Sequence, residues 1–124
     1  MLKFFRLAAI LTIFSFNTFN SPASIAGSAT NLQGAGAKVI VYGINYDGEN
    51  YYIGQILNRT GKTLKFLRVY YKLLNAQGQI VDVGRTYIME DELRGSQNGT
   101  FRLQVPKESG VANVVITSAE WIGD

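Results

Sequence analysis

The chain has 124 residues, which is room for one domain, and it contains neither histidine nor cysteine. Without histidine, the usual general base near neutral pH and the commonest metal ligand are both missing. Without cysteine, there is no thiolate nucleophile, no disulfide and no soft metal site. We therefore expect a protein that is not an enzyme, with no catalytic, metal-binding or cofactor-binding residues and no cofactor.

The first 29 residues have the three-part layout of a secretory signal peptide. Lys3 and Arg6 form a positive start, an apolar stretch follows over residues 7–16, and small polar residues lead to Ala26 and Ala29. A signal helix is expected here, with cleavage after Ala26 or Ala29. As a helix the apolar stretch would span only about 15–20 Å, short of the roughly 30 Å of a bilayer core, so a retained anchor is the weaker alternative. The expected location is secreted or periplasmic, with membrane contact only before cleavage.

Removing this segment changes the charge of the protein. The formal net charge of the full chain is +3, with 12 basic and 9 acidic residues. Lys3 and Arg6 leave with the signal, so ten basic and nine acidic residues remain and the net charge falls to +1. The basic balance therefore does not indicate nucleic-acid binding.

Strand signals recur about every ten residues beyond a Gly- and Ala-rich stretch at 30–37, which is expected to be a flexible leader. Six strands are expected, over residues 38–46, 51–58, 64–74, 79–88, 100–105 and 113–121. Turn residues separate them, and residues 89–95 are expected to cross between sheets. Residues 38–124 are therefore predicted to form an all-β domain, an immunoglobulin-like antiparallel β-sandwich of six to seven strands.

Side-chain alternation predicts which faces of these strands are buried. In the third strand, one set should face the core (Leu67, Val69, Tyr71 and Leu73) and the other should face outward (Arg68, Tyr70 and Lys72). In the fifth strand the inward set is Phe101, Leu103 and Val105. In the fourth strand the apolar set is Val81, Val83 and Tyr87, with Arg85 as a misfit near an edge. The second strand is apolar on both faces.

Several of these segments carry a known pattern. Gly54–Asn58 resembles a G-x-V-x-N strand-and-turn motif, and Tyr71–Asn75 lies where an F-x-L-Y-D signature would fall. Gly78–Val81 fits the glycine and apolar pair that follow that signature, and Leu93–Gly95 is similar to an L-x-P-G loop that leads to the inward Phe101. Residues 52–105 therefore resemble the bacterial FxLYD domain family.

The sequence departs from that pattern at four positions. Tyr71 replaces Phe, Leu74 replaces Tyr, Asn75 replaces Asp, and Arg94 replaces Pro. The resemblance implies an exported or membrane-tethered immunoglobulin-like sandwich, and it brings no catalytic residues. It implies structural roles for the matching residues, with Asn58 capping a turn through its side-chain amide, as does Asn75.

Three groups of residues are candidate sites. The outward stripe of Arg68, Tyr70 and Lys72 could bind an acidic protein, an anionic glycan or lipid head groups; the alternative is an ordinary solvated sheet face. The tyrosines around the first hairpin could bind a glycan, or they could pair across strands and stabilise the hairpin (Tyr42, Tyr46, Tyr51 and Tyr52). The acidic run Glu90, Asp91 and Glu92 could serve a small hydrolase, although a solvated loop explains it better.

These observations predict an exported, non-catalytic binding or structural module of the cell envelope. The expected partner is an envelope protein or a glycan. A carbohydrate-binding module and a small secreted hydrolase are the two alternatives.

Overall fold

A computed structural model describes residues 27–122, and strands make up more than half of them. Their bounds are β1 Gly27–Ala29, β2 Val39–Tyr46, β3 Tyr51–Asn58, β4 Leu64–Leu74, β5 Ile80–Tyr87, β6 Glu92–Leu93, β7 Asn98–Gln104 and β8 Asn113–Ile122. One short 3-10 helix, η3 (Lys107–Ser109), precedes β8. The described residues contain no α-helix and no helical segment long and apolar enough to cross a membrane.

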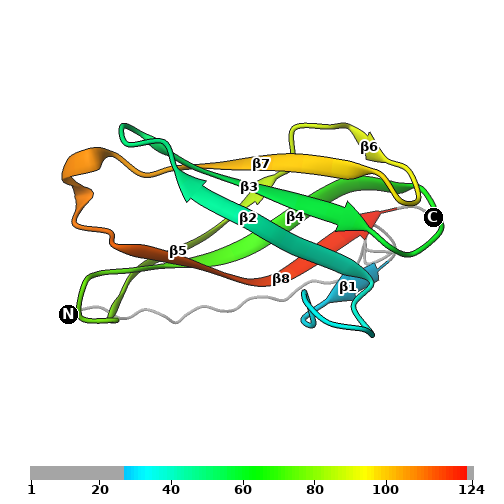
Figure 1. The fold of residues 1–124 in the computed structure, drawn as a ribbon, viewed down its shortest axis with the longest axis horizontal. Coiled ribbons are helices and arrows are strands. Elements are labelled where there is room, and N and C mark those ends of the chain that lie inside the picture. Colours follow the sequence, from blue (N-terminus) through cyan, green and yellow to red (C-terminus); the bar gives the residue numbers. More distant parts are fainter. Residues whose placement is uncertain (1–26, 123–124) are drawn as a thin grey trace, which may run out of the picture.

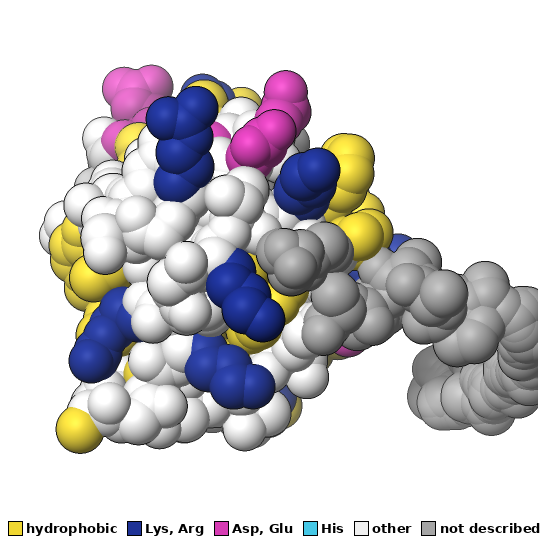
Figure 2. Space-filling view, turned by 90° about the vertical axis from the view of Figure 1, so that its right-hand side faces the viewer, with side chains coloured by type: hydrophobic (Ala, Val, Ile, Leu, Met, Phe, Trp, Pro, Cys, Tyr) yellow, Lys and Arg dark blue, Asp and Glu magenta, His cyan; other side chains and the backbone are white. Residues whose placement is uncertain are grey.

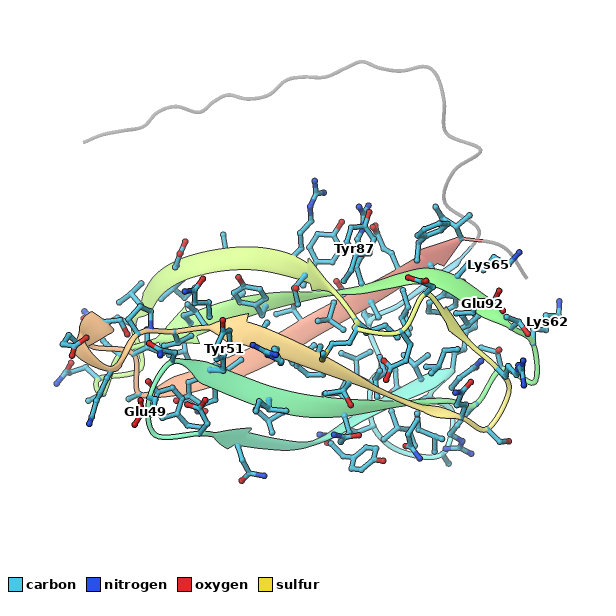
Figure 3. All side chains as sticks on the ribbon, turned by 90° about the horizontal axis from the view of Figure 1, so that it is seen from above. Glu49, Tyr51, Lys62, Lys65, Tyr87 and Glu92 are labelled. Carbon is cyan, nitrogen blue, oxygen red and sulfur yellow. The ribbon has the colours of Figure 1, made fainter. Side chains whose placement is uncertain are left out.

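The strands form two antiparallel sheets. One sheet has the order β1-β8-β4-β5, with the two-residue β6 also paired to β4, and the other has the order β2-β3-β7. Most strands run close to the long axis of the molecule (Figure 1), and a view from above shows the two sheets as separate layers (Figure 3). This is the layered arrangement of a β-sandwich, so the all-β prediction is confirmed.

The core lies between the two sheets and follows the alternation of β4 and β7. Leu67, Val69 and Leu73 are buried from β4, and Phe101 and Leu103 from β7. The neighbouring strand β3 leaves room for the Phe101 ring at Gly54, where a Cβ atom would lie 2.4 Å from that ring. Because Phe101 is fully buried, its truncation to alanine is expected to cost about 3–5 kcal/mol.

The expected strand bounds agree closely with the observed ones. Two short strands were not expected. Strand β6 lies inside the predicted crossing segment 89–95, and β1 pairs with β8 through Gly27↔Trp121 and Ala29↔Ala119. Both are too short to show a period in the sequence, and only their pairing partners define them.

Residues 30–37, expected to be a flexible leader, pack against the domain. Leu32 and Ala37 are buried, and the carbonyl of Leu32 accepts a hydrogen bond from the backbone amide of Val41 at 3.0 Å. The sequence suggested a leader because this stretch is rich in glycine and alanine and shows no strand period. The expected signal helix and the Ala26 cleavage position fall on residues 1–26, outside the described residues.

The expected orientation of β5 is wrong. Val81, Val83 and Tyr87 are 49%, 62% and 55% exposed instead of buried. The inward positions of this edge strand are Asp82, Gly84 and Thr86, which follow from the pairing of Asp82 with Leu73 and of Gly84 with Tyr71. The apolar side chains of β5 therefore face solvent.

The cause of this reversal lies in the strand beside β5. The Tyr71 side chain lies across Gly84, where a Cβ atom would come within 2.6 Å of the phenol oxygen, so a larger residue does not fit at that position. The register also shifts by one residue between Leu73 and Leu74, which places Val81 in a bulge. A one-residue shift exchanges the two faces of a strand.

Candidate functional site

The outward side of the larger sheet gathers one basic and apolar surface. Pairing places Tyr87, Arg85 and Val83 of β5 beside Arg68, Tyr70 and Lys72 of β4, in that order. Glu120 of β8 lies beside Arg68 on the other side. We call this surface, defined by these seven residues, the outer face. Tyr87 projects from the β5 layer, away from the second sheet (Figure 3).

A hydrogen-bonded cluster holds one end of the outer face. The Oε1 atom of Glu120 accepts bonds from Arg68 Nε at 2.9 Å, from Arg68 Nη2 at 2.7 Å and from the Tyr70 hydroxyl at 2.7 Å. The Arg68 guanidinium also lies 5.7 Å from the ring centroid of Tyr70 and 5.8 Å from that of Tyr87. These contacts hold the planar groups in fixed positions.

The electrostatics of the cluster show that it is internally satisfied. Burial alone would raise the pKa of Glu120, but hydrogen bonds from Tyr70 and Arg68 outweigh burial and hold that pKa below its ordinary value of 4.5. Burial would lower the pKa of Arg68, and its bond to Glu120 raises it instead. Within residues 27–122, Arg68–Glu120 is the only ion pair.

The other end of the outer face is hollowed. Tyr70, Lys72, Val83 and Arg85 line a shallow hollow of about 390 Å³ together with Tyr71, Gly84 and Thr117. Lys72 and Arg85 are exposed, and neither forms an ion pair with a carboxylate among the described residues. The hollow therefore offers an apolar surface beside two cations.

The predicted stripe thus splits into two parts. The structure brings Arg68 and Tyr70 together around Glu120, while Lys72 lines only the hollow, to which Tyr70 also contributes. Sequence reasoning missed four members of the outer face, because they join the stripe only through strand pairing: Val83, Arg85, Tyr87 and Glu120. Gly84 was the available signal, since a glycine inside a strand often marks the close approach of another group.

The four tyrosines of the first hairpin do not form one platform. Tyr46 and Tyr52 stack with ring centroids 4.8 Å apart and pack against the core, and the Tyr46 hydroxyl donates to the Val105 carbonyl at 2.8 Å. Tyr51 lies under the Arg102 guanidinium at 4.1 Å, and Tyr42 donates to the side chain of Asn98. Each ring has its own partners, as the hairpin-stabilising interpretation expects.

The three residues of the acidic run have separate structural roles and do not form one site. Glu90 Oε1 accepts a bond from the backbone amide of Thr100 at 2.9 Å, and the Asp91 carbonyl accepts one from the amide of Phe66 at 3.3 Å. Glu92 begins β6. Across residues 27–122, no three carboxylates gather in a way that could hold a metal ion. The run serves to connect β5 to β7.

Comparison with known proteins gives little. No family model matches the chain, and no curated protein matches it. Among solved structures, it is similar to the crystal structure of a DUF1425 family member from Shewanella sp. pv-4, with 17% sequence identity and a TM-score of 0.46 over 84% of this chain and 95% of that chain. A likeness at this level supplies no argument about function, and the FxLYD resemblance stays a prediction.

Proposed function

We propose that this protein is an exported, non-catalytic binding module of immunoglobulin-like type, whose outer face docks onto another protein of the cell envelope. The observation that carries this proposal is the reversed strand β5, which exposes Val83 and Tyr87 while its own inward positions are small or polar. Exposed apolar side chains grouped on one surface are typical of interaction sites.

The chemistry of the outer face favours one kind of partner. Its charged members are Arg68, Lys72 and Arg85 against the single carboxylate Glu120, and Glu120 is already paired with Arg68. A complementary surface would carry an apolar side chain for the hollow and carboxylates for Lys72 and Arg85. The rigid Arg68 cluster would lower the entropic cost of binding, because its side chains are ordered in advance.

A photo-crosslinking experiment in the producing cells tests the proposal. A benzophenone side chain at Val83 should give a discrete adduct, and the same group at Gln104, exposed on the other sheet, should not. Lys72→Glu and Arg85→Glu should each weaken the adduct at least tenfold, because each places a carboxylate against the partner's own. Lys107→Glu, on η3 and outside the outer face, is the matched control.

Two results would contradict the proposal. One is equal adduct from Val83 and Gln104, which would indicate chance collisions. The other is an adduct that survives both charge reversals, which would leave the outer face without a role in recognition. Arg68 and Tyr70 are left intact in this design because both hold Glu120 and their loss would disturb the sheet itself.

A glycan-binding role for the four tyrosines has less support. Their rings are engaged separately with the core, with Arg102 and with Asn98. A hydrolase based on Glu90, Asp91 and Glu92 has less still, since Glu90 already accepts a backbone bond.

A further inference from the structure

A second hollow, separate from the outer face, lies at one end of the sandwich. It has a volume of about 550 Å³ and lies between Gly27 of β1, the segment 35–38 and the turn 59–62 that follows β3. A volume of this size lies in the range of small-molecule sites, about 300–1,000 Å³. Leu64 and Trp121 supply the larger apolar side chains of its lining, beside Ala35 and Ala37.

The charged groups of this hollow have one sign. Lys38, Arg59 and Lys62 line it, and no aspartate or glutamate does so among the described residues. Lysine and arginine side chains gather on this end of the molecule, with acidic side chains at its upper edge (Figure 2). Lys62 and Lys65 are labelled at the same end in Figure 3, with Glu92, which does not line the hollow, between them. Three cations without a carboxylate favour an anion in the hollow.

The turn 59–62, which carries Arg59 and Lys62, is held by hydrogen bonds to a buried side chain. The buried side chain of Asn58 donates to the carbonyl of Lys62 at 2.6 Å and to that of Leu93 at 2.8 Å, and it accepts from the amide of Thr60 at 2.9 Å. The guanidinium of Arg59 donates to the carbonyl of Gly34 at 3.3 Å. The turn is therefore a fixed platform and not a loose loop that happens to be basic.

We infer that this hollow, the basic end site, binds the phosphate group of an organic phosphate. Arginine recognises phosphate through paired N–H donors, and two lysines add point charges around it. The apolar lining from Leu64 and Trp121 would contact the organic part of the ligand. The phosphate could belong to a small phosphate ester or to a lipid head group, and both sources offer the same chemistry to the site.

Trp121 provides a direct readout of binding. It is the only tryptophan of the chain and it lines the basic end site. Inorganic phosphate titrated into the protein recovered from expression of the full chain should change its fluorescence in a saturable way. Sodium chloride of matched ionic strength should not. Arg59→Gln and Lys62→Gln should each weaken the apparent affinity at least fivefold, with circular dichroism unchanged.

A control variant tests the specificity of phosphate binding, and a second experiment distinguishes a lipid head group from a small phosphate ester. Lys107 lies on η3, at the other end of the molecule from the basic end site (Figure 1). Lys107→Gln should therefore bind phosphate as the unsubstituted protein does. Co-sedimentation with phosphatidylglycerol vesicles, compared with phosphatidylcholine vesicles, then distinguishes the two ligands. Sedimentation that is lost in Arg59→Gln points to a lipid phosphate. Saturable phosphate binding without sedimentation points to a small phosphate ester.

Three results would overturn the inference. They are a chloride response equal to that of phosphate, an equal loss of affinity in Lys107→Gln and Arg59→Gln, and no response to either phosphate or anionic vesicles. None of these results bears on the outer face, so the two proposals fail independently.

Discussion

At the residue scale, Asn58 is the polar group on which the interior depends most. It is fully buried, and both its amide nitrogen and its oxygen are hydrogen-bonded to the turn after β3 and to the carbonyl of Leu93. The turn-capping role that the FxLYD resemblance implied for Asn58 agrees with these contacts. Asn75 caps its own exposed turn in a similar way, through the amides of Gln77 and Gln79.

These two asparagines make a matched pair of substitutions. Asn58→Ala is expected to lower the free energy of unfolding by about 2–4 kcal/mol, because the Leu93 carbonyl loses its donor in the interior. Asn75→Ala should cost about 1 kcal/mol or less, since water replaces the lost bonds. Urea unfolding of both variants checks this. Equal losses would show that Asn58 has no special place in the core.

Glu120 should link stability to pH. Its pKa lies below 4.5 in the folded protein, since the bonds from Tyr70 and Arg68 outweigh the opposing effect of burial. The Glu120 carboxylate therefore binds a proton more readily in the unfolded chain than in the folded protein. Its contribution to stability is fully present above the pKa of the unfolded chain and is lost as the pH falls through the pKa of the folded protein.

Thermal unfolding between about pH 6 and about pH 3 tests this linkage. The unsubstituted protein should lose Tm over this range more steeply than Glu120→Gln, whose side chain does not titrate. The difference in Tm between the unsubstituted protein and Glu120→Gln should be largest at the upper end of this pH range. A constant gap would mean that Glu120 contributes nothing through its charge.

At the scale of single elements, β5 decides the proposed function, because its apolar side chains face solvent while its small ones face inward. A substitution that keeps β propensity tests this orientation without disturbing the strand. Val83→Thr should change the free energy of unfolding by less than about 0.5 kcal/mol, because the side chain is already in water.

Val114→Thr is the control for that substitution. Val114 is a buried valine of β8, so a hydroxyl placed there should cost about 1–3 kcal/mol. Guanidinium unfolding of both variants gives the comparison. A cost at position 83 as large as that at position 114 would place Val83 in the core and would remove the basis for the outer face.

At the scale of the whole molecule, β1 bears on where a mature chain would begin. Ala26 and Ala29 are each the last residue of a small-residue cleavage pattern. Cleavage after Ala29 would remove all of β1, including Gly27, which lies against the Trp121 indole. Cleavage after Ala26 would keep the strand and leave its α-ammonium group at the rim of the basic end site.

We therefore expect processing after Ala26. Intact-mass measurement and N-terminal sequencing of the exported protein should give Gly27 as the first residue. A protein that begins at Thr30 would contradict this expectation. A protein that still begins at Met1 would contradict the signal peptide itself.

The sequence by itself determined the six longer strands of this protein. Strands β3 and β4 begin and end where their turn residues predict, and the inward sets of β4 and β7 face the core, with Tyr71 only partly buried. Such features are local: a strand shows its period over a few residues, and glycine or asparagine marks its end.

Only the tertiary structure decided which faces and residues come together. The approach of Tyr71 to Gly84 and a one-residue bulge turned β5 over, and pairing with β8 brought Glu120 to Arg68. The basic end site likewise joins Lys38 to a turn more than twenty residues away. Register and packing depend on partners distant in the chain, which a local pattern does not contain.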